Sequence, residues 1–154
     1  MYLFDFLKEP LKMNFEAYTY GPFCREIPKI LEDMEIDGDV ILERNNISLA
    51  RQAESDEKKH MRPEDKERLD RYLNIFYNDI LQGNISFGRV ELYGTVMYVM
   101  DVLDVEAGCR EAPPTLPQVF EAVLHWKKNK FSKRKIEEAY LRISEHLWHL
   151  RTAA

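Results

Sequence analysis

The sequence has little that would point to a catalytic, metal or redox centre. Its two cysteines, Cys24 and Cys109, lie far apart without CxxC spacing, which favours reduced thiols in a cytoplasmic protein over a disulfide scaffold. Its six glycines form no phosphate-binding loop, and neither GxSxG nor HExxH occurs. His125, His146 and His149 lack the regular spacing of zinc ligands. We therefore expect no enzymatic activity, no cofactor and no metal.

Long apolar runs are missing as well. No window approaches the roughly 20 apolar residues that a membrane span needs, so no membrane association is expected. With 154 residues, 45% hydrophobic and 32% charged, the chain has the composition of an ordinary globular protein. We predict one domain, 1–154, in which residues 1–50 form a helix, a short strand, a helix and a hairpin. A polar linker over 51–62 then leads to a helical core over 63–151.

The predicted fold class is mainly α, a compact helical domain with a small winged-helix-like β-hairpin. Pro63 opens an amphipathic helix, and the next one, which Ser86 caps, is apolar on almost every side and should be buried at the centre. Thr115 and Gln118 have the spacing of a capping box at the start of a helix through Trp126. Ser132 caps the last helix.

The N-terminal third combines strand and helix signals. Phe15–Tyr20 alternates as a strand does, and Gly21 with Pro22 should break it, Pro22 then opening a helix that carries Phe23 on its apolar face. Asp37–Asp39 ends that helix. Two short apolar segments on either side of Arg44–Asn46 predict the hairpin.

A helix followed by a hairpin is the outline of a winged helix, so a nucleic-acid-binding transcriptional regulator is the alternative function. Against it, residues 24–35 carry a net charge of −2, which repels phosphates. The whole chain has a net charge of −5, but residues 122–151 alone carry +5. This charge is either a surface for an acidic partner or an attraction between the two halves of the fold. The candidate nucleic-acid contacts are Arg44, Arg51, Lys127, Lys128, Lys130, Lys133, Arg134 and Lys135.

The last helix has apolar residues outside its main stripe. Leu141 and Trp148 lie seven residues apart on a different side. An exposed ridge of this kind would suit a protein partner or a second copy in a homodimer, because tryptophan is common in interface hot spots. Alternatively the helix is sandwiched and both sides belong to the core.

The segment Phe15–Ile27, with Tyr20-Gly21-Pro22-Phe23 at its centre, resembles the YwgA-like family and, more distantly, the Panacea (SocA-like) antitoxin domain. In those families an aromatic Tyr-Gly-Pro turn precedes a helix and an acidic-Gly-apolar step, matched here by Asp37–Ile41. Cys24 departs from the small serine-like residue that is common after the turn, and the first helix is shortened to Met1–Glu9. Further similar segments are Val90–Val99, Val123–Lys127, Phe131–Ser132 and Ile136–Ala139.

The resemblance implies a helical domain with a winged-helix-like portion and no established enzymatic chemistry. The Panacea relatives neutralise toxins, or deliver them to proteolysis, by protein contact. We therefore predict a non-enzymatic protein-interaction or regulatory module, antitoxin- or adaptor-like, whose partner is a toxin or a component of a protease system. The predicted partner-binding residues are Tyr20, Gly21, Pro22, Phe23, Arg25, Leu141 and Trp148.

Overall fold

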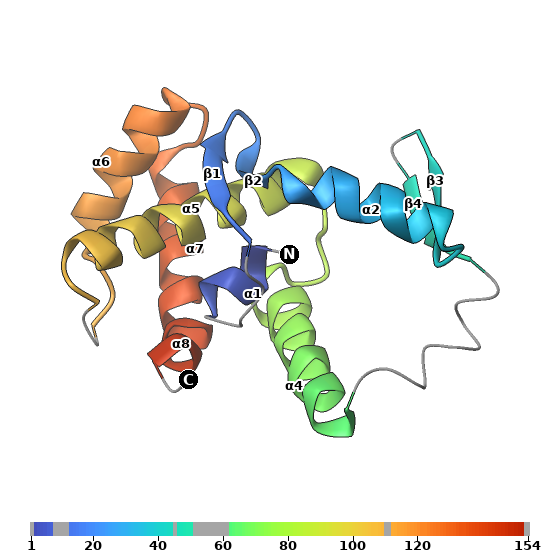
Figure 1. The fold of residues 1–154 in the computed structure, drawn as a ribbon. Helices are drawn as coiled ribbons and strands as arrows, with labels where there is room; N and C mark the ends of the chain where they lie inside the picture. Colours follow the sequence, from blue (N-terminus) through green and yellow to red (C-terminus); the bar gives the residue numbers. More distant parts are fainter. Residues whose placement is uncertain (1, 8–12, 45, 51–61, 110–111, 153–154) are drawn as a thin grey trace. The chain divides into compact units, whose positions relative to one another are not determined.

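A computed structural model of the chain describes residues 2–7, 13–44, 46–50, 62–109 and 112–152. These residues form a mainly α structure with two small two-stranded sheets (Figure 1). The chain divides into two compact units, one made of residues 1–23 and 72–154 and the other of residues 24–71. The first 23 residues are thus grouped with the C-terminal helices and not with residues 24–50. The single domain stays a prediction.

The larger unit is built around α5 (Phe87–Glu106), the helix predicted to be buried. Helices α1 (Tyr2–Phe6), α6 (Leu116–Lys127) and α7 (Lys133–His146) pack against it, and α8 (Trp148–Thr152) follows α7 after a break at Leu147 (Figure 1). The apolar residues that α5 buries are Leu92, Tyr93, Val96, Met97, Val99 and Met100.

The remaining helix starts follow the sequence. Helix α4 (Pro63–Asn74) opens at Pro63, runs across the boundary between the two units and continues as the π-helix η2 (Ile75–Ile80). The capping box is present at the start of α6, where the Thr115 N–H donates to the Gln118 Oε1 at 3.0 Å. The predicted linker over 51–62 lies almost wholly outside the described residues. No helix in the described part of the chain is both long and apolar enough to cross a membrane.

Residues 15–24 form a hairpin. The prediction of a strand followed by a helix that opens at Pro22 was therefore wrong. Strand β1 (Phe15–Tyr18) pairs with β2 (Gly21–Cys24), so Pro22 lies in a strand and the helix begins only at Glu26. Gly21, at φ +125°, turns the chain back, a conformation that favours glycine. A strand of a two-stranded sheet is an edge strand, where a proline without an N–H is tolerated. Phe23 therefore lies on a strand and not on a helix face.

The smaller unit contains the predicted helix and hairpin. Helix α2 (Glu26–Ile36) is capped by Asp37, and Gly38 follows at φ +80°. The Asp39 N–H donates to the Met34 carbonyl at 2.9 Å, as in a Schellman motif. Strands β3 (Val40–Glu43) and β4 (Asn46–Leu49) pair antiparallel with Val40 opposite Leu49. A small antiparallel hairpin thus follows the helix, as predicted.

Candidate partner-binding site

The turn of the β1–β2 hairpin rests on α5. Gly94 of α5 has no side chain, and a Cβ placed there would lie 3.5 Å from the Cδ of Pro22. The proline ring therefore packs directly above the helix backbone. The Tyr-Gly-Pro turn and the Val90–Val99 segment, two separate parts of the family resemblance, meet at this contact.

A buried ion cluster also holds the turn of the β1–β2 hairpin in place, through hydrogen bonds to its main-chain oxygens. Lys130 donates to both carboxylate oxygens of Glu91, at 2.7 and 2.8 Å, and Lys127 lies 3.3 Å from one of them. The Lys127 Nζ also donates to the main-chain oxygens of Thr19 and Tyr18, at 2.6 and 3.3 Å. The side chains of Glu91 and Lys127 are only 1% and 4% exposed. Such charges are stable inside a protein only when they are paired in this way.

Burial affects Lys127, the member of this cluster that approaches the hairpin most closely. Loss of hydration lowers the pKa of Lys127, and the hydrogen bond and charge of Glu91 oppose that effect. The Lys127 ammonium lies 4.5 Å from the centre of the Trp126 ring, which adds a cation–π contact. Position 127 is thus specialised for holding the turn.

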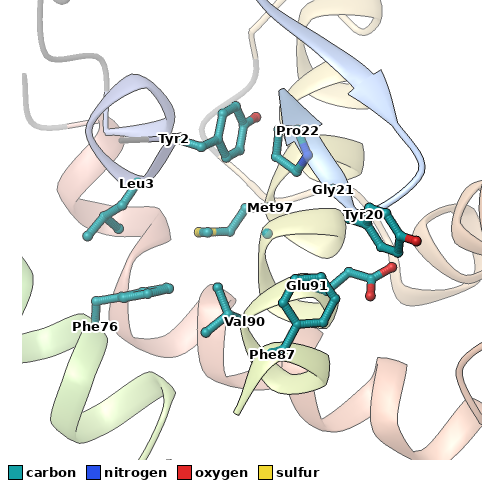
Figure 2. Close-up of a pocket in the computed structure, with 11 residues that line it drawn as sticks. Tyr2, Leu3, Tyr20, Gly21, Pro22, Phe76, Phe87, Val90, Glu91 and Met97 are labelled. Carbon is teal, nitrogen blue, oxygen red and sulfur yellow. The ribbon is translucent and has the colours of Figure 1, made fainter. Parts of the chain in front are cut away.

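A cavity of about 210 Å³ lies between the turn, α1, η2 and α5 (Figure 2). At its mouth Tyr20 and Phe87 are 60% and 66% exposed, and their rings meet edge to face with centroids 5.5 Å apart. We call this cavity with its two aromatic residues the aromatic groove. Its remaining lining residues are Tyr2, Leu3, Gly21, Pro22, Phe76, Val90, Glu91, Gly94 and Met97.

The lining of the aromatic groove suits binding better than catalysis. Glu91 is its one carboxylate, and Lys127 and Lys130 occupy that group. The phenols of Tyr2 and Tyr20 are the other ionisable groups of the lining. Aromatic and aliphatic side chains form the rest, so the groove offers apolar area with one fixed polar edge.

Three of the predicted partner-binding residues, Tyr20, Gly21 and Pro22, lie together in this groove. Phe23 points elsewhere, with its ring 5.3 Å from that of Tyr18, and Arg25 belongs to the smaller unit. Phe87 and Glu91 were missed. Phe87 follows a cap residue and was not part of the apolar pattern, and Glu91 is an acid on a helix that otherwise reads as core.

The structure corrects the ridge on the last helix. Trp148 is only 4% exposed, because Phe6 packs against its ring and the Arg151 guanidinium lies 4.6 Å above it. Leu141 alone is exposed, at 47%. The alternative, a helix with both sides in the core, holds at Trp148, and we do not retain this residue as a partner contact.

The candidate nucleic-acid contacts are divided between the two units. Lys127 is buried in the ion cluster, which removes it from that set, and Lys130 holds Glu91. Arg44 is exposed in the β3–β4 turn of the smaller unit, and Arg51 lies outside the described residues. Among the described residues no group of three His, Cys, Asp or Glu side chains could hold a metal ion. In the described part of the larger unit, the exposed lysines and arginines are Lys128, Lys130, Lys133, Arg134 and Lys135.

Comparisons with known protein families, with curated proteins and with solved structures give no match. The resemblance to the YwgA-like family therefore stays a prediction, which rests on the Tyr20–Phe23 turn and the patterns downstream.

Proposed function

We propose that the chain is a non-enzymatic protein-interaction module of the antitoxin or adaptor type, acting in the cytoplasm, and that it binds its partner through the aromatic groove. The observation that carries this proposal is the pair of exposed rings, Tyr20 and Phe87, at the mouth of an apolar cavity. Its predicted place in the YwgA-like and Panacea group supports the antitoxin or adaptor role.

The size of the groove favours a protein partner. Sites for small molecules usually measure about 300–1,000 Å³, whereas this cavity measures about 210 Å³. One large apolar side chain of a partner suits it better than a free metabolite does. More than half of each aromatic residue at the mouth is still exposed and available for burial on binding, and buried aromatic residues contribute strongly to interface energies.

The alternative, a winged-helix nucleic-acid-binding regulator, has less support. The predicted contact Lys127 is buried, and α2 keeps its excess of acidic residues. Duplex DNA titrated at low and high salt tests it directly, because phosphate contacts make binding strongly salt-dependent.

A mutational pair tests the groove. The double variant Tyr20→Ser, Phe87→Ser removes both exposed rings, and Val105→Ser removes a similarly exposed apolar residue elsewhere on the same unit, outside every predicted partner contact. All three proteins should show the same circular dichroism. The product of the neighbouring gene, which an antitoxin would be expected to contact, is the first partner to test by co-purification and by rescue of growth.

We expect wild type and Val105→Ser to bind that product, and the double variant to lose at least tenfold in affinity, as loss of hot-spot residues does. Cross-linking from a photoreactive residue at position 87, but not at the exposed Val105, should capture the same product. Equal binding by the double variant and wild type would remove the aromatic groove as the binding site.

A further inference from the structure

A second cavity, of about 440 Å³, lies beside the first turns of α5. Its lining is more polar than that of the aromatic groove, and it contains three cations and one carboxylate, Glu138. We call it the basic pocket. The lining residues that matter here are Ser86, Gly88, Arg89, Tyr93, Lys130 and Lys135.

The cations of the basic pocket retain unused hydrogen-bonding capacity. Arg89 reaches the Ile80 carbonyl, Gln82 and the Tyr93 hydroxyl only at 3.3–3.4 Å, and its buried Nε has no hydrogen-bond partner. Lys135 is exposed and makes no ion pair with any described residue. A guanidinium and an ammonium thus line one cavity with donors to spare.

The charge balance of the pocket also favours an anion. The lining has three cations, Arg89, Lys130 and Lys135, and one carboxylate, Glu138, which lies 3.6 Å from Arg89, so its net charge is +2. Lys130 is also paired with Glu91, whose charge Lys127 shares. The first turns of α5 and α7 contain no acidic residue, so the positive ends of these helices add to the field.

The pocket suits a single carboxylate better than a nucleic-acid backbone. A duplex needs a stripe of cations that follows its phosphates, whereas this cavity has three cations beside the carboxylate of Glu138, on a chain with a net charge of −5. A single carboxylate needs only one such cavity, and an arginine beside a lysine gives it charge-assisted hydrogen bonds.

We propose that the basic pocket binds an acidic side chain of the same partner segment whose apolar side chain fills the aromatic groove. This inference rests on the proposed function. The two cavities adjoin: Lys130, which lines the basic pocket, donates to Glu91, which lines the aromatic groove, and its ammonium lies 5.3 Å from the centre of the Tyr20 ring. An extended chain rises roughly 3.3 Å per residue, so the two partner residues are a few positions apart.

Two labelled peptides test this directly, one with the core Phe-Gly-Ser-Gly-Glu and one in which Gln replaces Glu. Each is titrated into the whole ¹⁵N-labelled chain. The Glu peptide should bind about tenfold more tightly than the Gln peptide, because charged hydrogen bonds are the stronger ones. It should shift the amide signals of Gly88 and Arg89 as well as those of Tyr20 and Phe87.

Charge reversal supplies the matched control. Lys135→Glu places an acid in the pocket, whereas Arg134→Glu makes the same change one residue away, at an exposed position outside the lining. The first should remove the preference for the Glu peptide, and the second should leave it intact. An equal loss in both variants would show general attraction to a positive surface and overturn the pocket.

The remaining outcomes separate this inference from the proposed function. Equal affinity for the Glu and Gln peptides, with binding still lost in Tyr20→Ser, Phe87→Ser, overturns the basic pocket and leaves the aromatic groove standing. If binding depends on Lys135 but is not weakened in Tyr20→Ser, Phe87→Ser, then both the shared partner segment and the aromatic groove are overturned. Tighter, salt-dependent binding of a 12-base-pair duplex would assign the pocket to phosphate instead of carboxylate.

Discussion

The ammonium group of Lys127 donates to the main-chain oxygen of Thr19 at 2.6 Å. This bond joins the C-terminal end of α6 to the β1–β2 turn across 108 positions of the sequence. Because Tyr20 and Pro22 follow directly and line the aromatic groove, the shape of the groove depends on a buried charge that does not line it.

The first prediction concerns this charge. Lys127→Met removes the donor to Thr19 and Tyr18 and leaves buried Glu91 with Lys130 alone. We expect the free energy of unfolding to fall by about 3 kcal/mol, as when one partner of a buried ion pair is removed. Urea denaturation measures the change. Lys128→Met, at an exposed neighbouring position, should stay within about 0.5 kcal/mol of wild type.

The second prediction is a pH dependence with a definite sign. Burial places the pKa of Lys127 in the folded protein below that in the unfolded chain, about 10.4. Between those two pKa values the unfolded chain binds more protons at Lys127 than the folded protein does. The contribution of Lys127 to the free energy of unfolding therefore rises with pH. The gap in unfolding free energy between wild type and Lys127→Met should therefore widen from pH 8 to pH 10.5. A gap that narrows would mean that pairing with Glu91 outweighs burial.

The third prediction compares two glycines at the turn. Gly21 has φ +125°, so Gly21→Ala forces a strained backbone and should cost about 1–3 kcal/mol. Gly94 is helical, and a methyl group there would make an ordinary contact with Pro22. Gly94→Ala should therefore be neutral or stabilising by up to about 1 kcal/mol. Thermal and urea unfolding distinguish the two, and equal destabilisation would contradict the separate roles.

Periodicity in the sequence predicted the helices well. The apolar spacing after Pro63, in 86–103, after Thr115 and after Ser132 gave α4, α5, α6 and α7 at nearly their observed starts. These signals are local, because a helix forms its hydrogen bonds within its own segment. The β3–β4 hairpin was also predictable from its turn at Arg44.

The features that the sequence did not predict depend on contacts between separate segments of the chain. Pro22 can open a helix or lie in an edge strand, and only its pairing with β1 decides between them. Of the site, the sequence indicated the Tyr20–Pro22 turn but not Glu91, whose burial depends on a lysine 36 residues away. For Trp148 the sequence left an exposed ridge and a buried position as alternatives, and only the contact with Phe6 decides for burial.

The last prediction concerns the charge beside Trp148. Arg151 pairs with Asp101 and, at 2.9 Å, with buried Asp104, and its guanidinium lies over the rings of Phe6 and Trp148. Arg151→Gln removes the cation from both carboxylates and should lower the free energy of unfolding by about 3 kcal/mol. Arg151→Lys keeps the charge but loses the planar guanidinium with its paired donors, so the free energy of unfolding should fall by a smaller amount. Adding Asp104→Asn to Arg151→Gln should restore part of the stability, because the uncompensated charge is then gone. If urea unfolding shows that the double variant is less stable than Arg151→Gln alone, Asp104 is held by its other contacts and not by this cation.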